Sequence, residues 1–456
     1  MYFMQLAGTK VGVLIGILLL AVLPVVSTAQ SAPCTIALEE FFGSSDSVWH
    51  LTSDEFMAAQ GTNGFVWEFA TRRTTARSVH PGLSFAGVHV WEAISGFENG
   101  ALKRLTLSLY NRGENGELSE RDFERLLVSI NRATEHWIGA AGVQFKEQAY
   151  PESVSTLRNV WVKEPHRIDM VWSFAVKHRD RGVTIPFHAE YVRLQITRFD
   201  SSEDPRHMAI VLGTSGTKSV DAANLRDRVK RDPNGDVAVA GVPMVDQGQK
   251  GYCVPATIER VLRYYGKNFD QHELAQIANA SSAIGTVSDL MLAALRRNGE
   301  ELGVEIIVVL RTDGKDLEEV TKDYNSVARS AGRTEITYTA KVDPIQIYGQ
   351  FDAQVLKQAR VKQEAKMNQF NADIARYLNA GVPLVWDVIL GKIKETTEVQ
   401  RTAPHCRMII GYNDRTGEIL YSDSWGPGHE FKRMYLSDAW TITLGLYAIV
   451  PHNTRW

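Results

Sequence analysis

The chain is predicted to be an α+β protein with a strand-rich first region, a linker and a second region in which helices precede a sheet. Residues 35–200 carry several runs of alternating apolar and polar residues, the pattern of half-buried strands. Residues 201–237 are polar, with Gly, Pro and Asp clusters typical of a linker. Residues 238–451 begin with helical periodicity. The 456 residues allow two or three domains, and 44% hydrophobic residues are enough for apolar cores.

Residues 1–29 have the features of a secretory signal peptide. Lys10 precedes an apolar run over residues 11–26, and small residues at 27–29 suit a cleavage site. The run is short for a membrane span, which needs about 20 apolar residues, and it contains Pro24. We therefore expect export to the periplasm, the cell surface or the extracellular space. An uncleaved N-terminal anchor is the alternative, and no later segment is apolar enough to cross a membrane.

The region 35–200 is expected to form a curved antiparallel sheet with at least one helix against it. The helix is predicted from about Glu120 to Trp137, because Ser119 followed three residues later by Asp122 is a capping-box start. The predicted strands are residues 64–70, 88–93, 102–110, 168–176 and 191–199. Its histidines show no metal-ligand spacing, and it is predicted to be an accessory domain of unknown function.

The second region is expected to form helices first and most of its strands later. The predicted helices are residues 253–265, 272–280, 288–297 and 352–378, with a short one around 222–229 in the linker. The predicted strands are residues 304–310, 335–341, 382–388, 408–410 and 418–422. A charged stretch from residue 312 to the strand at 335 has no assigned element.

The segment Asp246–Tyr265 carries the strongest chemical signal. A Gly-rich polar loop leads to Cys253, and apolar residues then recur every three or four positions, as in an amphipathic helix. Cys253 is thus expected in the first helical turn, where the positive end of the helix dipole stabilises a thiolate. Because a lone cysteine is more often a small buried apolar residue, its role as nucleophile depends on partners.

Three other residues supply what a cysteine nucleophile needs. His405 begins an apolar strand and is the candidate base. Asp423 ends the following strand, where its carboxylate is expected to orient the imidazole, the alternative being a turn cap. Gln247, six residues before Cys253, is the candidate oxyanion donor together with the Cys253 backbone N–H. Cys406 is expected to point into the core, because adjacent side chains on a strand face opposite ways.

The order Cys253, His405, Asp423, with Gln247 before the cysteine, resembles the papain-like cysteine peptidases. The run Asp-Ser-Trp-Gly from Asp423 is similar to the Asn-Ser-Trp-Gly run of that superfamily, with Asp in place of Asn, and its Trp is expected to pack against the His405 hairpin. The runs Gly-Tyr-Cys-Val-Pro-Ala-Thr, Ala-Gly-Val-Pro-Met and His…Gly-Tyr-Asn are closer to one branch. That branch resembles the peptidase domain that processes double-glycine leader peptides. The resemblance implies a two-subdomain fold over residues 238–451, with a helical part and an antiparallel sheet.

Together these features predict an exported cysteine peptidase that hydrolyses peptide bonds with a Cys253–His405–Asp423 triad and Gln247 as oxyanion donor. The expected partner is a peptide or protein substrate. Nucleic acid is not expected as a partner, since the formal net charge is −3, and no metal or organic cofactor is expected either. Two alternatives remain open. One is acyl transfer or amidase action by the same triad, and the other is a binding protein in which the triad is idle.

Overall fold

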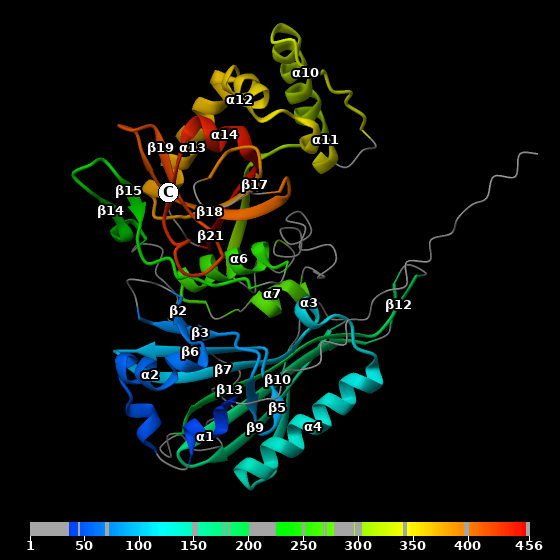
Figure 1. Cartoon of the computed structure of the whole chain (residues 1–456), viewed down its shortest axis with the longest axis vertical. Helices are drawn as coiled ribbons and strands as arrows, with labels where there is room; N and C mark the ends of the chain where they lie inside the picture. The colour runs from blue at the N-terminus through cyan, green and yellow to red at the C-terminus, as the bar shows by residue number, and fades with distance from the viewer. Residues whose placement is uncertain are drawn as a thin grey trace, which may run out of the picture.

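The computed structural model describes residues 36–43, 46–68, 73–147, 154–176, 178–180, 183–199, 225–248, 251–267, 269, 271–277, 296, 303–340, 344–395 and 401–452 (Figure 1). These residues form helices and largely antiparallel sheets, so the predicted α+β class is confirmed. The described residues form two large hydrophobic cores, one in the first half of the chain and one in the second, and a small separate cluster of Tyr252 and Ala275. The predicted signal peptide, most of the helix predicted at 288–297 and most of the predicted linker lie outside the described residues. None of the helices in the described ranges combines the length and apolarity that a bilayer crossing requires.

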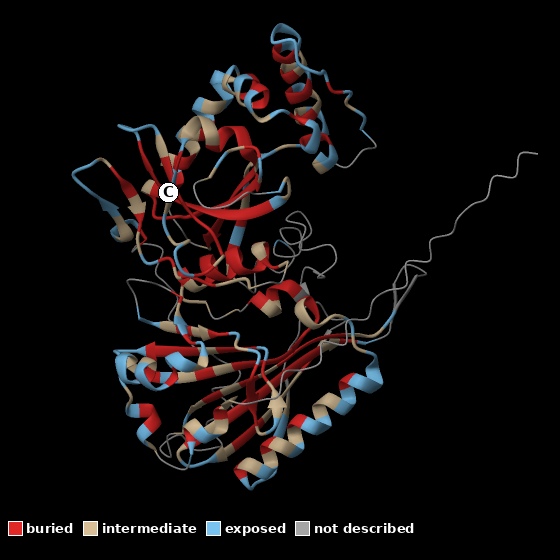
Figure 2. Ribbon diagram, in the orientation of Figure 1, coloured by how far each residue is buried: buried red, intermediate tan, exposed pale blue. Residues whose placement is uncertain are grey.

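An eight-stranded antiparallel sheet organises the first core. In spatial order its strands are β2 (Val66–Trp67), β3 (Thr75–Ser78), β6 (Glu92–Glu98), β7 (Ala101–Asn111), β13 (His188–Arg198), β10 (His166–Ala175), β9 (Val154–Lys163) and β8 (Val143–Glu147). Helix α4 (Glu120–Ile138) lies against this sheet with its inner side chains buried and its outer face exposed (Figure 2). As predicted, Ser119 caps it by accepting a hydrogen bond from the N–H of Asp122.

Shorter elements surround this sheet. They are β1 (Ile36–Ala37), β4 (Leu83–Phe85) and β5 (Val88–His89) in one small sheet, β11 (His178–Asp180) and β12 (Val183–Ile185) in a ribbon, the helices α1 (Leu38–Phe42), α2 (Ser53–Gln60) and α3 (Arg112–Asn115), and 3₁₀ turns at Asp46–His50 and Gly61–Asn63. The single strand predicted at 88–93 is wrong, because the chain changes sheets there. Val90 N–H donates to β4 and Trp91 N–H to β7, so β5 ends before β6 begins. Within the described part of the strand predicted at 64–70, only the two residues of β2 form a strand.

The second core is built on another mainly antiparallel sheet. Its strand order is β14 (Val229–Arg231), β15 (Val237–Val239), β18 (Pro404–Asn413), β17 (Leu384–Ile389), β21 (Thr443–Pro451) and β16 (Val304–Arg311), with β19 (Glu418–Ser422) paired to β18 and β20 (Lys432–Tyr435) paired to β19. β17 is buried along its whole length. Helix α6 (Cys253–Tyr264) packs on β18, where the Thr257 hydroxyl donates to the Cys406 carbonyl at 3.4 Å.

The helix predicted over residues 352–378 is wrong, because two helices occupy this stretch. Besides α6, the helices that the structure describes in the second core are α7 (Gln271–Ile277), α10 (Gly314–Ser330), α11 (Pro344–Gln350), α12 (Ala353–Val361), α13 (Glu364–Asn379) and α14 (Leu436–Ile442). The carbonyl of Arg360 accepts the indole N–H of Trp440 at 2.9 Å and the N–H of Gln363 at 3.0 Å. With these two donors the Arg360 carbonyl is satisfied without the N–H of the residue four positions later, the bond that would continue α12.

Two further stretches between β16 and β17 differ from expectation. α10 fills most of the charged stretch, starting at a capping box formed by Asp313 and Asp316. No strand forms over the described part of 335–341. Instead, the backbone N–H and C=O of Ile336 both bond to the side-chain amide of Asn325 at 2.8 Å, which satisfies them without a partner strand.

The prediction of a linker over residues 201–237 is wrong at its C-terminal end, where the chain is already folded. A 3₁₀ turn at Arg226–Arg228, β14 and the start of β15 lie within it, and Leu225 is fully buried in the second core. β15 pairs with β18, because its apolar residues complete that edge of the sheet. Residues 225–237 are therefore part of the second folded unit.

Candidate active site

The four predicted site residues meet where α6 approaches β18. Cys253 is the first residue of α6 and is half-buried. His405 is the second residue of β18, and Asp423 directly follows β19, the antiparallel neighbour of β18. Gln247 lies in the segment that leads into α6. The packing of α6 on β18 thus brings residues about 150 positions apart in the chain into one site.

His405 and Asp423 form a buried hydrogen-bonded pair. Their Nε2 and Oδ1 atoms are 3.0 Å apart, and the residues are 7% and 0% exposed. The Cys253 side chain lies beside the His405 ring and is one of the groups that raise the pKa of His405. Because Nε2 faces the carboxylate, Nδ1 is the ring nitrogen that remains to face the thiol. The thiol, the imidazole and the carboxylate therefore stand in this order, which is the order that nucleophilic catalysis by a cysteine requires.

The surroundings of His405 favour its protonated form. Burial acts to lower the pKa of His405, but the hydrogen bonds to Asp423 and Cys253, with the charges of both groups, raise it to about 9. Trp425 stacks on the imidazole with ring centroids 4.5 Å apart and planes inclined by 18°. The packing of Trp425 against this hairpin is thus confirmed, and the indole covers one face of the imidazole.

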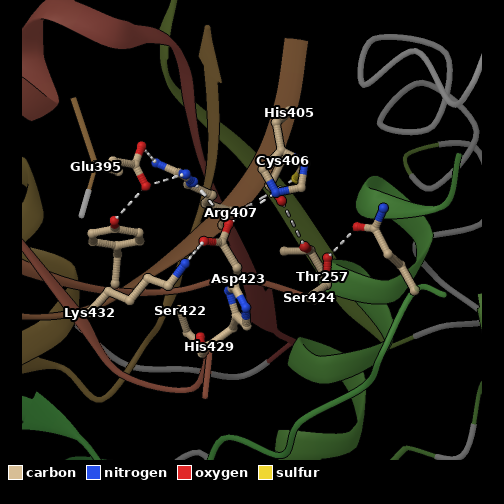
Figure 3. Close-up of polar contacts among 12 residues, drawn as sticks. Thr257, Glu395, His405, Cys406, Arg407, Ser422, Asp423, Ser424, His429 and Lys432 are labelled. Carbon is tan, nitrogen blue, oxygen red and sulfur yellow. Dashed lines mark hydrogen bonds and ion pairs between the residues drawn. The ribbon is translucent and has the colours of Figure 1, made fainter. Parts of the chain in front are cut away.

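Two cations compensate the buried Asp423 carboxylate. Arg407 Nε donates to Oδ1 and Lys432 Nζ donates to Oδ2, both at 2.9 Å (Figure 3). Burial would raise the pKa of Asp423, but Arg407, His405 and Lys432 hold it well below its ordinary value. Asp423 is therefore ionised and able to accept from His405 over the physiological pH range.

Further contacts hold this arrangement from behind. Arg407 makes a two-pronged ion pair with Glu395, at 2.9 and 2.8 Å (Figure 3). Arg260 of α6 is buried and donates to the backbone carbonyls of Asp423 at 3.0 Å and of Pro243 at 2.7 Å. The helix that carries the thiol is thus tied to the strand end that carries the carboxylate.

Ser424 fixes the orientation of Gln247. The Gln247 N–H donates to the Ser424 carbonyl at 2.8 Å, and the Ser424 hydroxyl donates to Gln247 Oε1 at 2.8 Å. Because Oε1 accepts this bond, the Nε2 end of the amide is the end that donates elsewhere. A fixed N–H donor is what stabilisation of an oxyanion requires.

The second cysteine in the described residues behaves as predicted for a core residue. Cys406 is a free thiol with 0% exposure. Burial, together with the charge of Asp387, raises the pKa of the Cys406 thiol well above its ordinary value.

Within the described ranges, no group of His, Cys, Asp and Glu side chains is arranged to hold a metal ion.

The sequence predictions missed Arg407, Lys432 and Ser424. Arg407 is two residues after His405 on the same strand, so both side chains face the same side, and this spacing was a usable signal. Ser424 lies inside the Asp-Ser-Trp-Gly run. Lys432 comes from β20, and no local pattern connects it to the site.

Comparison with known proteins gives a family match for the second half of the chain. Residues 239–445 match the peptidase C39-like family, and the matched segment contains Gln247, Cys253, His405 and Asp423. No curated protein shows a significant match to the chain. Residues 239–445 therefore belong to the peptidase C39-like family, within the papain-like cysteine peptidase superfamily.

Proposed function

We propose that the chain is an exported cysteine peptidase that hydrolyses peptide bonds in a peptide or protein substrate. The observation that carries this proposal is the His405 imidazole, which bonds to Asp423 on one side and has the Cys253 side chain beside it. The family match of residues 239–445 supports the same chemistry. In this proposal α6 and α7 form the helical part and the sheet around β18 forms the second part of a papain-like two-subdomain fold, with the site between them.

In the proposed mechanism the Cys253 thiol transfers its proton to His405, and the thiolate attacks the carbonyl carbon of the scissile bond. The electron pair of the C=O bond moves to oxygen, where the Gln247 amide and the Cys253 backbone N–H donate to it. His405 then gives its proton to the leaving amine. Water, deprotonated by His405, hydrolyses the thioester and releases the acid. Asp423 keeps the imidazole in the orientation that these transfers need.

Export is proposed on the apolar segment near the N-terminus, at residues 11–26. An exported thiol enzyme must keep its nucleophile reduced, which fits the half-buried position of Cys253 beside His405. Cell fractionation with N-terminal sequencing of the mature chain tests this part. A chain retained in the cytoplasm with its first 29 residues intact would contradict it.

The activity is tested by incubating the full chain with a mixed peptide library and identifying products by mass spectrometry. New peptide termini are expected from the wild-type chain and not from Cys253→Ser or His405→Ala. Adding glycine amide as an acceptor separates the alternatives, because ligated products in place of free acids would indicate acyl transfer. If no peptide is processed and iodoacetamide labels Cys253 equally fast in wild type and His405→Ala, the triad is idle.

A further inference from the structure

The segment before the nucleophile is held by a side chain from the other half of the chain. Asp246, next to Gln247, accepts the N–H of Gly248 on Oδ1 at 2.8 Å and the Nη1 of Arg77 on Oδ2 at 2.8 Å. Arg77 belongs to β3 of the first sheet and is also paired through Nε with Glu92 at 2.6 Å. The ion pair therefore joins the first folded unit to the residue adjoining the oxyanion donor.

This ion pair is shielded from water. The side chains of Arg77, Asp246 and Glu92 are 11%, 14% and 2% exposed. Charge pairs that are withdrawn from solvent hold a more defined geometry than exposed ones and are screened less by salt. The pair is thus suited to fixing the position of a backbone segment.

Asp246 is also enclosed on its other side. Gly426 has a left-handed backbone, with φ of +77°, and a Cβ there would lie 2.5 Å from Asp246 Oδ2. Gly426 follows closely after Ser424, which bonds to Gln247 through both backbone and side chain. Asp246 therefore lies between Arg77 and the turn at residues 424–426, which orients Gln247. A shift of Asp246 must therefore also move Gln247.

The other end of the segment has a similar anchor. Tyr252, which directly precedes Cys253, donates its hydroxyl to Asn111 Oδ1 of β7 at 2.8 Å. A Cβ at Gly113 would lie 2.5 Å from that hydroxyl, so the first unit is shaped to admit it. The residues before Gln247 and before Cys253 are thus both bonded to the first sheet, which faces α6 and α7 across the junction of the two units (Figure 1).

We propose that Arg77 is a positioning residue of the peptidase site, which places Gln247 through Asp246. The first unit then acts as a structural part of the active site. This inference rests on the proposed function, since it assigns Gln247 as the oxyanion donor. It distinguishes Arg77, which bonds to Asp246 beside Gln247, from Arg193, which makes its ion pair between the units with Glu273 of α7 at 2.7 Å.

Two reactions of the same thiol test the proposal. Acylation by p-nitrophenyl acetate passes through an oxyanion, whereas alkylation by iodoacetamide does not, so the ratio of the two rates reports oxyanion stabilisation and not thiolate content. Gln247→Ala is expected to lower this ratio about 100-fold, the usual effect of losing one oxyanion donor. Arg77→Gln is expected to lower it about tenfold, with little change in the alkylation rate. Arg193→Gln is the matched control and should leave the ratio unchanged.

Two further variants make the outcome decisive. Arg77→Gln added to Gln247→Ala should cause no extra loss, because both act through one donor. Asp246→Asn preserves the Arg77–Glu92 pair and serves if Arg77→Gln does not fold, and it should lower the ratio in the same direction. Unchanged ratios in both Arg77→Gln and Asp246→Asn, beside a lowered ratio in Gln247→Ala, would overturn the positioning role and leave the proposed peptidase intact. An unchanged ratio in Gln247→Ala would instead remove the oxyanion assignment, and the inference with it.

Discussion

Arg407 Nε donates to the same Asp423 oxygen that bonds to His405, at 2.9 Å, and neither the arginine nor the aspartate side chain is exposed. The ion pair explains how a charged carboxylate can be buried directly behind the histidine. An unpaired buried carboxylate would be costly, whereas one paired with Arg407 and Lys432 keeps its charge. The negative charge in turn stabilises a protonated imidazole.

Replacing Arg407 with Met should destabilise the second unit strongly. The change removes one of the two cations paired with the Asp423 carboxylate and also removes the ion-pair partner of Glu395. Breaking a buried pair typically costs about 3–5 kcal/mol. The urea midpoint of the unfolding transition, followed by tryptophan fluorescence, measures the loss. Arg329→Ala is the control, because its ion pair with Glu335 is exposed and should change stability by less than about 1 kcal/mol. Equal midpoints for Arg407→Met and wild type would contradict the structural role of this pair.

Peptide hydrolysis should decline on the alkaline side with a midpoint near pH 9. The pKa of His405 is raised to about 9 from an ordinary 6.5, because hydrogen bonds to Asp423 and Cys253 outweigh the effect of burial. Because the pKa is raised in the folded chain, the protonated imidazole stabilises the folded state fully below about pH 6.5. This contribution to stability is lost as the pH rises through about 9. The same loss removes the proton that the leaving amine needs. The pH profile of kcat/KM for a cleaved peptide measures it.

Asp423→Asn tests the cause of that pH limit. Removing the carboxylate charge should move the alkaline midpoint to lower pH, because less negative charge then stabilises the imidazolium. Glu335→Gln removes an exposed carboxylate elsewhere in the second unit and should leave the profile unchanged. A midpoint that stays near 9 in Asp423→Asn would show that Asp423 does not set the pKa of His405.

Alkylation of the folded chain should distinguish Cys253 from Cys406. Cys253 is half-buried at the start of α6, whereas Cys406 has no exposed area and a pKa raised by burial. Iodoacetamide at neutral pH is therefore expected to modify Cys253 within minutes and Cys406 only after unfolding. Peptide mapping by mass spectrometry, with and without urea, gives both rates. Labelling of Cys406 at the rate of Cys253 in the folded chain would contradict its core position.

Much of the site could be predicted because it depends on local patterns. A Gly-rich loop followed by helical periodicity placed Cys253 at the start of α6, and alternation placed His405 and Asp423 at the ends of paired strands. The charge environment could not be predicted in this way. Lys432 reaches Asp423 only because β20 pairs with β19, a register that no local pattern of residues specifies.

The fold predictions failed where tertiary contacts replaced local ones. Helical periodicity continues through residues 352–378, but Trp440 takes the carbonyl of Arg360 and ends α12. The β-prone residues near Ile336 form no strand because Asn325 satisfies their backbone. The hydrogen bonds that Arg77 and Asn111 make to the segment before Cys253 could not be predicted either, because they join residues more than 100 positions apart in the chain.

Trp425 should contribute to catalysis by covering the imidazole. Its indole stacks on His405 at a centroid distance of 4.5 Å, and such aromatic contacts are worth about 0.5–1.5 kcal/mol. Trp425→Ala is therefore expected to lower kcat/KM for a cleaved peptide about threefold to tenfold, because the imidazole loses its fixed orientation and gains access to water. Trp425→Phe keeps a stacked ring and should retain most of the rate. Equal losses in both variants would show that the indole acts through contacts other than stacking on His405.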